Sequence, residues 1–309
     1  MTSSTVSTAS IMPAPASGVA LALGALYLIW GSTYLAIRFA LEGGFPPFLL
    51  GGIRFLVAGG LFYGVLRWRG VPAPTRAQWR SLLPMGFFML LLGNGMVNLA
   101  ETTVSSGLTA VTLASSALWL AVFAAVRGDR PTRLEWAGLG IGFLGVVWLN
   151  VGSSLNGSTV GLIALLVACI GWAYGSIWSR GRDLPAPFMS AAGQMLCGGL
   201  LMTGAGLAMG ERFAHVPDAR AIAAFWYLVV LGSLGGFTAY IWLLNHVRPA
   251  LAGSYAYVNP AIAVLLGAWL AHERFDGSEL VAMGVILLGV VVITFGKALR
   301  KMVAGSDAA

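Results

Sequence analysis

Arg54 is the clearest charge inside an otherwise apolar stretch of this sequence, the run 47–66. A charged side chain at membrane depth is costly, so it faces the interior of a helix bundle or a water-filled cavity. A guanidinium group matches a carboxylate in a planar fork. We therefore expect Arg54 either to clamp the carboxylate of a substrate or to tie two helices together as a structural contact.

Amide and carboxyl side chains recur at helical spacing in the third apolar run. Asn94, Asn98 and Glu101 are four and three residues apart, so they share one face of a helix. We expect Asn94 and Asn98 to line the interior and Glu101 to lie near the outer mouth. There Glu101 pairs with Arg54 or Arg38, takes up a proton, or stays a solvated carboxylate at the end of the span.

The most polar mid-span stretch of the second half contains a proline. Ser254, Tyr255, Tyr257 and Asn259 precede Pro260. Proline removes a backbone donor and frees a carbonyl one turn earlier, and such freed groups line a cavity or find partners. We expect a kink at a binding or hinge site, with a kink that serves packing alone as the alternative.

Several aromatic side chains fall inside the apolar runs. Trp30 and Trp172 lie near the middle of their runs, at equivalent positions of a repeat described below, and Tyr34 follows Trp30 by one helical turn. The two tryptophans can face each other across a central cavity and stack on an apolar or aromatic ligand. Core packing is the alternative for each of these residues.

The composition excludes most classes of soluble protein. Of 309 residues, 58% are hydrophobic and only 9% are charged, whereas a soluble globular domain carries about 25% charged residues. Disordered chains are poor in apolar residues and rich in charge. The net charge of +7 comes from basic residues between the apolar runs, which indicates membrane topology rather than a nucleic-acid surface.

The sequence carries no signature of a cofactor or metal. Cys169 and Cys197 lie in apolar runs without metal-ligand spacing, and we interpret them as small core residues. His215, His246 and His272 are far apart in the sequence, and no Walker phosphate loop is present. Acidic and nucleophilic residues do not cluster. We expect no catalytic residue, no metal and no cofactor, and thus no enzyme.

About ten apolar runs approach the 20 or so residues that a membrane-spanning helix needs. Barrel strands alternate apolar and polar residues, and these runs do not, so we expect helices. The runs are 18–40, 47–66, 82–100, 107–126, 134–151, 160–179, 188–209, 221–244, 251–270 and 280–297. We interpret 1–17 as a disordered cytoplasmic tail before an uncleaved first span, and 298–309 as a second cytoplasmic tail.

Basic residues mark one side of the expected membrane protein. Thirteen Arg and Lys residues lie in one set of connections and the C-terminal tail, and Arg212, Arg220 and Arg274 lie on the other side. The positive-inside rule therefore places both termini in the cytoplasm. An even number of spans gives the same result.

An internal repeat divides the chain into two halves of five spans, 18–151 and 160–297. Asp129 recurs as Glu273 at an offset of 144, Trp30 and Arg38 recur as Trp172 and Arg180 at 142, and Pro47 recurs as Pro187 at 140. An odd number of spans per half inverts the second half, which is typical of secondary transporters. Arg54 then corresponds to Gln194, which is polar but neutral.

Glycine is unusually frequent, with 42 residues. Small residues let membrane helices approach each other closely. We interpret three Gly-x-x-x-Gly stripes, which begin at Gly138, Gly171 and Gly232, as close-packing faces without a chemical role.

Short motifs from several spans act together as a family signature. They are Trp30-Gly31-Ser32-Thr33-Tyr34, Arg38, Arg54, Gly93-Asn94-Gly95-Met96-Val97, Glu101, Ser254-Tyr255-Ala256-Tyr257-Val258-Asn259-Pro260, Gly267 and Glu273. With them the sequence resembles the EamA family of the drug/metabolite transporter superfamily, from about residue 20 to 297. The resemblance implies ten-helix export of amino acids, other metabolites, pigments or toxic compounds. The first-span glutamate that four-helix multidrug relatives use for proton coupling has no match here.

We therefore expect an all-α membrane protein of about ten transmembrane helices in two inverted five-helix repeats. It is expected to export small metabolites, above all amino acids or related compounds, across the bacterial inner membrane by alternating access. A drug, toxin or pigment efflux carrier of the same superfamily is the alternative. The expected partners are a small-molecule substrate and the lipid bilayer, without nucleic acid, and the chain is expected to act as a monomer.

Arg54 is the expected clamp for a substrate carboxylate. The other expected substrate-binding residues are Trp30, Tyr34, Asn94, Asn98, Trp172, Gln194, Tyr255 and Asn259, and the expected coupling or gate residues are Glu101 and Pro260. Because no carboxylate lies near the centre of a span, we expect facilitated transport driven by the substrate gradient. Proton antiport through Glu101 is the rival.

Overall fold

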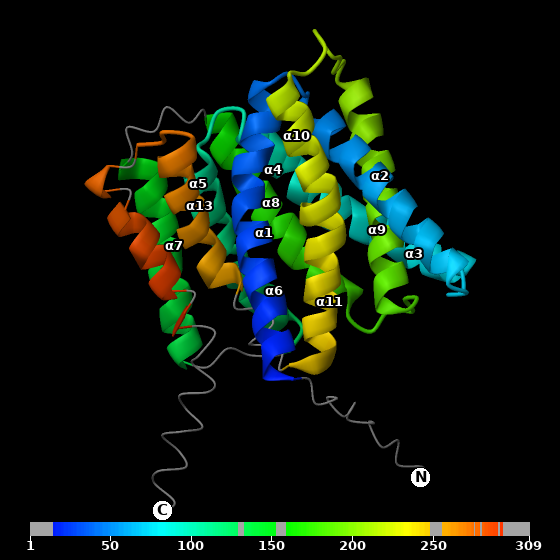
Figure 1. Ribbon diagram of the computed structural model, residues 1–309. Helices are drawn as coiled ribbons and strands as arrows, with labels where there is room; N and C mark the ends of the chain where they lie inside the picture. Colours follow the sequence, from blue (N-terminus) through cyan, green and yellow to red (C-terminus); the bar gives the residue numbers. More distant parts are fainter. Residues whose placement is uncertain are drawn as a thin grey trace, which may run out of the picture.

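The computed structural model describes residues 15–128, 133–152, 159–247, 255–274, 276–278, 280–289 and 291–292. These residues are mostly helical, and no strand occurs among them (Figure 1). Seven segments are long and apolar enough to cross a membrane: Ala16–Glu42, Pro47–Trp68, Arg76–Ala100, Ser106–Val126, Thr159–Ser179, Pro187–Ala208 and Ala219–Leu243. Shorter apolar helices cover Trp136–Gly145, Val258–Leu270 and Leu280–Gly289. The expected helical membrane architecture is confirmed, and the number of ten spans stays a prediction.

The first three segments of the two halves follow one another in the same order. The first half contains α1 (Ala16–Glu42), α2 (Pro47–Trp68), α3 (Arg76–Met85), η1 (Gly86–Gly95), α4 (Met96–Ala100), α5 (Ser106–Ala114), α6 (Ser116–Val126) and α7 (Arg133–Gly152). The second half contains α8 (Thr159–Ser179), α9 (Pro187–Ala208), α10 (Ala219–Tyr227), η2 (Leu228–Gly235), α11 (Gly236–His246) and α13 (Tyr255–Leu270). In both halves the third segment consists of three parts.

Two helix starts bear on the sequence predictions. The third segment begins at Arg76 and not at 82. The Thr75 hydroxyl accepts a hydrogen bond of 3.2 Å from the Gln78 amide, and the Gln78 side chain accepts one of 3.0 Å from the Thr75 amide. This capping box starts a helix that basic residues had hidden from the apolar pattern. Similarly, α1 begins at Ala16, inside the predicted tail, directly after Pro15.

The two halves repeat details of backbone conformation. Each switches to a π-helix in its third segment, at η1 and at η2. Gly70 after α2 and Gly210 after α9 have φ of 82° and 80°, a conformation that glycine adopts without strain. Both helices also carry a proline in the first turn, Pro47 and Pro187. The sequence repeat is therefore matched by equivalent helix starts, helix ends and π-helices.

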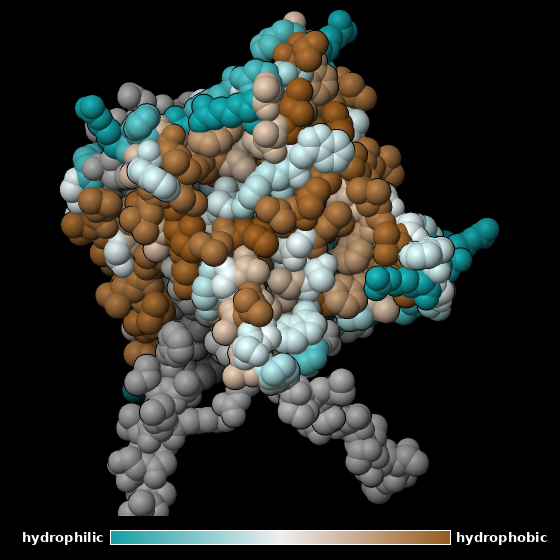
Figure 2. All heavy atoms as spheres, viewed as in Figure 1, coloured by the Kyte–Doolittle hydropathy of each residue, from teal (hydrophilic) through white to brown (hydrophobic). Residues whose placement is uncertain are grey.

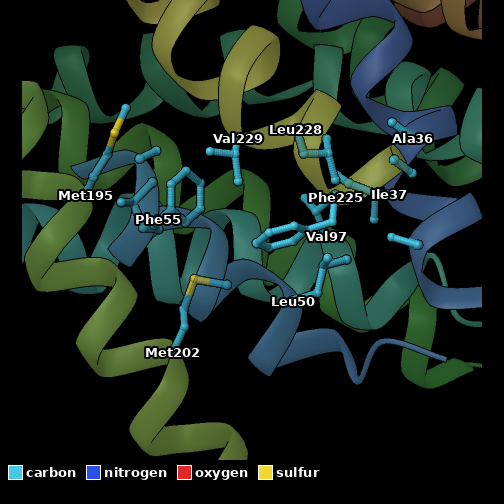
Figure 3. Close-up of a cluster of buried hydrophobic side chains, with 14 of the residues drawn as sticks. Ala36, Ile37, Leu50, Phe55, Val97, Met195, Met202, Phe225, Leu228 and Val229 are labelled. Atoms are coloured by element: carbon cyan, nitrogen blue, oxygen red, sulfur yellow. The ribbon is translucent and has the colours of Figure 1, made fainter. Parts of the chain in front are cut away.

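Glycines bring α2 and α9 into backbone contact. A Cβ atom on Gly52 would lie 2.7 Å from the backbone nitrogen of Thr203, and one on Gly199 would lie 2.8 Å from the backbone nitrogen of Leu56. Close approach of this kind drives helix association in lipid. Around this contact lies a buried apolar cluster whose members include Leu50, Phe55, Val97, Met195, Met202, Phe225, Leu228 and Val229 (Figure 3).

Apolar side chains form much of the outer surface. Brown, hydrophobic residues cover the middle of the molecule, and hydrophilic ones gather at its upper edge near the α10 end (Figure 2). Large exposed apolar residues include Leu21, Leu28, Leu61, Leu166, Leu200, Trp226 and Leu265. Water-soluble proteins rarely expose extensive apolar patches, so this surface fits contact with lipid.

Some predictions fall on residues outside the described ranges. They include residues 1–14 and 298–309 of the predicted tails, residues 251–254 (with Ser254), 290 and 293–297 of the predicted spans, and Asp129. The side chain of Tyr257 is likewise outside the description.

Candidate functional site

Arg54 is a buried cation with neutral neighbours. It lies on α2 with 5% of its surface exposed. Its Nε donates a hydrogen bond of 2.9 Å to the hydroxyl of Ser233 in η2, and its guanidinium carbon lies 4.9 Å from the centre of the Phe55 ring. No carboxylate of the described residues lies within ion-pair distance of it. Arg54 thus ties α2 to η2 without being neutralised there.

The guanidinium of Arg54 lies against bare backbone. A Cβ atom on Gly232 would lie 3.0 Å from Nη2 of Arg54 and 3.1 Å from Cγ2 of Thr33. Arginine carries five N–H donors, and Nε is the one with a hydrogen-bond partner among the described residues. Burying a charge without a counter-ion costs several kcal/mol of free energy. The position of Arg54 therefore favours the binding of an anion.

Trp30 belongs to an aromatic cluster formed with Phe237, Tyr240 and Tyr255. The Trp30 ring centre lies 5.5, 5.4 and 4.9 Å from those of the other three rings. Its Nε1 donates a hydrogen bond of 3.1 Å to the carbonyl oxygen of Gly232. Of the predicted aromatic residues, the structure therefore brings Trp30 and Tyr255 into direct contact.

The π-helix η2 joins Arg54 to this aromatic cluster. Gly232 accepts the Trp30 hydrogen bond, and the next residue, Ser233, accepts the Arg54 hydrogen bond. A Cβ atom on Gly236 would lie 2.1 Å from Trp30 Nε1, so the indole is seated on this glycine. The predicted close packing at the Gly232 stripe therefore involves two candidate site residues, Arg54 and Trp30. Because glycine has no side chain, Gly232 and Gly236 leave room for Arg54 and Trp30. π-Helices such as η2 are frequent at functional sites.

The equivalent contacts, from α8 and α9 of the second half to η1 of the first half, involve weaker chemistry. Gln194 of α9 lies with Nε2 3.5 Å from the Met89 sulfur of η1. The Trp172 ring lies against η1, where a Cβ atom on Gly93 would be 3.4 Å from it. The described ring pairs of Trp30 do not include Trp172. Each tryptophan therefore packs on a π-helix, and stacking of a ligand between them stays a prediction.

Asn94 and Asn98 have separate surroundings. The Asn94 side chain donates a hydrogen bond of 3.3 Å to the carbonyl oxygen of Met89, five residues earlier. Asn98 is buried and donates one of 2.9 Å to the carbonyl oxygen of Pro47, while its Oδ1 has no described partner. Because η1 extends through Asn94 to Gly95, the backbone leading to Asn98 is not α-helical throughout, and the shared face stays a prediction.

Glu101 is buried, so the interpretation of a solvated carboxylate is wrong. It is 5% exposed, and neither of its carboxyl oxygens has a hydrogen-bond partner in the described residues. Its position just beyond the Arg76–Ala100 segment is enclosed by neighbouring helices instead of opening to water. Neither Arg54 nor Arg38 forms an ion pair with it. Burial raises the pKa of the Glu101 carboxyl well above its usual range, and the Glu273 carboxylate adds to this.

The remaining predicted residues lie in the packed interior. Tyr34 is half-buried against the apolar cluster that surrounds the α2–α9 contact. Asn259 is buried, and its Oδ1 has no partner in the described residues. The Cα of Asn259 would lie 3.5 Å from a Cβ atom on Gly31 of α1. Helix α13 continues through Pro260 to Leu270, and the hinge role of Pro260 stays a prediction.

Sequence reasoning missed the role of Glu273, which follows α13. Its Oε1 accepts hydrogen bonds from Nη1 of Arg38 and, at 2.8 and 2.7 Å, from the amide and hydroxyl of Ser106. Its Oε2 accepts one of 3.1 Å from the Gly107 amide, and Arg38 Nε donates one of 2.7 Å to Glu42. We call Arg38, Glu42, Ser106, Gly107 and Glu273 the Arg38–Glu273 cluster. It joins α1, α5 and the end of α13.

The signal for this cluster was present in the repeat. Arg38 and Glu273 both have equivalents in the other half, Arg180 and Asp129. Offsets between matched residues do not show which residues meet in space. The ion pair between Arg38 and Glu273 could therefore be found only from the three-dimensional structure. Ser233 accepts the hydrogen bond from Arg54, and no comparable signal in the sequence indicates this role.

The sequence model of the EamA-like transporter family matches residues 16–151 and 159–295 of this chain. The chain is also 41% identical over 277 residues to YedA of Escherichia coli strain K12, described as an uncharacterized inner membrane transporter. This similarity covers 89% of the chain and 90% of YedA.

More distant similarities cover nearly the full chain as well. A probable amino-acid metabolite efflux pump of Salmonella typhimurium is 24% identical over 296 residues, which cover 89% of this chain and 94% of that protein. A crystal structure, described only as that of a protein, is similar with a TM-score of 0.63 at 20% identity. It covers 91% of this chain and 99% of the solved one, and it shows the fold alone.

Proposed function

The chain belongs to the EamA-like transporter family, and on that basis we propose that it is a secondary transporter that exports small metabolites across the bacterial inner membrane. Amino acids or related compounds are the proposed substrates. Alternating access of two inverted five-span halves moves the substrate, with both termini in the cytoplasm and a monomer as the working unit.

The observation that carries the substrate class is the buried, unneutralised guanidinium of Arg54. Its Nε is held by Ser233 at 2.9 Å, which fixes the side chain while the remaining N–H groups can bind an anion. A carboxylate receives two parallel hydrogen bonds from guanidinium. The ion pair would also remove the cost of burying the charge alone. Amino acids carry such a carboxylate.

The neutral counterpart of Arg54 supports a substrate with one charged end. Gln194 occupies the equivalent position of the other half, where its Nε2 lies 3.5 Å from the Met89 sulfur. A dicarboxylate would favour cations in both halves. We therefore assign the carboxylate to the η2 side and the remainder of the substrate to a less polar surface.

The aromatic cluster favours a second candidate function. The rings of Trp30, Phe237, Tyr240 and Tyr255 lie beside η2 and offer stacking surfaces to an apolar or aromatic compound. A drug, toxin or pigment efflux carrier would use this surface without needing Arg54. The Salmonella relative is described as a probable amino-acid metabolite efflux pump, which supports the first candidate.

Uptake into liposomes that contain the purified protein tests the proposal. The panel consists of radiolabelled aromatic and aliphatic amino acids, their decarboxylated amines, and cationic dyes, each with and without a pH gradient. We expect saturable uptake of amino acids above empty liposomes. Flux of dyes and amines without amino-acid flux would establish the second candidate instead.

A matched pair of variants separates the role of Arg54 from a general effect of removing positive charge. Arg54→Gln copies the residue of the other half. Arg67→Gln removes a charge from the end of the same helix, where Arg67 donates a hydrogen bond of 2.7 Å to the exposed Val71 carbonyl oxygen. We expect only Arg54→Gln to reduce amino-acid flux. An equal effect of both variants would contradict the clamp.

A further inference from the structure

Glu101 is a buried carboxyl group to which substrate binding assigns no role. It follows α4 and has no hydrogen-bond partner for either oxygen in the described residues. An ionised carboxylate in such a place is far costlier than the neutral acid, because burial penalises the charged form. The geometry therefore favours a proton on Glu101 in this conformation.

The titratable groups that interact electrostatically with Glu101 come from two neighbouring segments. α1 contributes Tyr34 and Arg38, and the segment after α13 contributes Glu273. From α8, Cys169 acts on Tyr34. The elements α2 and η1 also pack against α4, and no described titratable group of theirs acts on Glu101. Glu273 disfavours ionisation of Glu101, and Arg38 favours it.

Arg38 is already shared by two carboxylates. It donates to Glu273 through Nη1 and to Glu42 through Nε. Glu273 in turn holds the first amides of α5, those of Ser106 and Gly107. As long as Arg38 stays with Glu273, α1, α5 and the end of α13 are joined. In that arrangement Glu101 has no counter-ion within ion-pair distance among the described residues.

We propose that Glu101 is a proton-binding site that controls the Arg38–Glu273 cluster. Protonated Glu101 leaves Arg38 paired with Glu273, and this end of the transporter is closed. Deprotonated Glu101 draws Arg38 away from Glu273 and thereby separates α1 from α5 and α13. The proton is exchanged with the aqueous phase at the loops 101–105 and 271–274.

The proposal fixes the direction of the pH effect. Burial raises the pKa of Glu101, so the closed arrangement binds the proton more tightly than an open one in which water reaches the group. The closed arrangement is therefore favoured at low pH and loses stability as the pH rises through the raised pKa. The inference deepens the proposed transport function by naming the proton as the coupling ion, but its test needs no substrate.

Infrared difference spectroscopy of the purified protein tests the protonation of Glu101. Spectra at neutral and alkaline pH are compared for the wild type, Glu101→Gln and Asp183→Asn. Asp183 is an exposed carboxylate that accepts a hydrogen bond of 3.1 Å from Gln78. We expect a carboxylic-acid C=O band in the wild type and in Asp183→Asn, and its loss in Glu101→Gln. A wild type without this band, or a Glu101→Gln variant that keeps it, overturns the proposal.

Distances between spin labels test the gate. Labels at Thr102→Cys and Gly277→Cys each lie four residues from a member of the Arg38–Glu273 cluster, Ser106 and Glu273. Both positions are exposed, and a Cβ atom on Gly277 meets nothing within 4 Å. Cys169 and Cys197 are buried, which favours selective labelling. We expect the distance distribution to shift to longer values at high pH, and the shift to be lost with Glu101→Gln. An equal shift in both proteins overturns the proposal.

Failure of the gate and failure of the transport proposal give different results. Without any transported amino acid, the infrared band and the label shift still report on Glu101. Conversely, amino-acid uptake that is independent of pH, together with an unprotonated Glu101, would support the transport proposal and contradict the proton coupling. Transport would then be facilitated by the substrate gradient.

Discussion

Arg54 and Arg38 are two arginines within spanning helices, and their surroundings differ. Arg38 is 27% exposed on its side chain and pairs with Glu42 and Glu273. Arg54 is more deeply buried and has a hydroxyl as its hydrogen-bond partner in the described residues. A charge paired inside the protein holds helices together, whereas an unpaired buried positive charge is a binding site for an anion. The partners, and not the residue type, separate the two roles.

The largest effect is expected from removing the carboxylate of the Arg38–Glu273 cluster. Glu273 is 1% exposed on its side chain, and Glu42 is 48% exposed. Glu273→Gln leaves Arg38 and the α5 amides without their anion, which costs about 3 kcal/mol of folding free energy. Glu42→Gln, the matched control, costs about 0.5 kcal/mol or less because exposed i,i+4 pairs are weak. Unfolding in detergent measures both, and equal losses would remove the distinction.

The next effect concerns Arg54 and has the opposite stability signature. Arg54→Gln removes a buried unpaired charge, so we expect unchanged or increased thermal stability. Flux of carboxylated substrates falls by about 10- to 100-fold, which is the worth of a hydrogen bond to a charged group. A thermal-unfolding curve and a flux assay on the same preparation test both statements. A strong loss of stability would make Arg54 a structural tie like Arg38.

A smaller effect is expected where the aromatic cluster meets η2. Trp30→Phe keeps a ring beside Phe237 and Tyr240 but removes the 3.1 Å hydrogen bond to the Gly232 carbonyl oxygen. Its loss costs about 1 kcal/mol, seen as reduced stability and a modest rise in KM for aromatic substrates. If transport of aromatic and aliphatic amino acids changes alike, the ring has only a packing role.

The smallest effect is expected at the neutral counterpart of Arg54. Gln194 contacts the Met89 sulfur at 3.5 Å, a weak acceptor at the limit of hydrogen-bond distance. Gln194→Ala therefore changes flux by less than about threefold. A loss as large as that of Arg54→Gln would show that both halves bind the charged end of the substrate.

Much of the helical architecture could be predicted because lipid forces long apolar runs into helices. The same argument located Arg54 and Glu101 as costly polar residues in or near spans. It misplaced the start of α3, since Arg76 and Arg80 interrupt the apolar pattern although Thr75 and Gln78 start a helix there. Periodicity along one chain reports the faces of a helix and not which helices meet.

The candidate site was predictable in its members but not in its connections. The repeat marked Arg38 and Glu273 as matched positions, yet their ion pair joins residues 235 positions apart. The π-helices have no pattern in residue type that separates them from α-helix, so the sharing of η2 by Trp30 and Arg54 could not be derived. Burial of Glu101 depends on helices packed around a span end, which hydropathy does not describe.

The most direct test of the central claim compares a transported amino acid with its amide. The two ligands differ in the carboxylate that Arg54 is proposed to bind. Titration calorimetry of the purified wild type should give at least about tenfold tighter binding of the acid. Arg54→Gln should bind the acid and the amide equally. An Arg54→Gln protein that keeps the full preference for the acid would contradict the account.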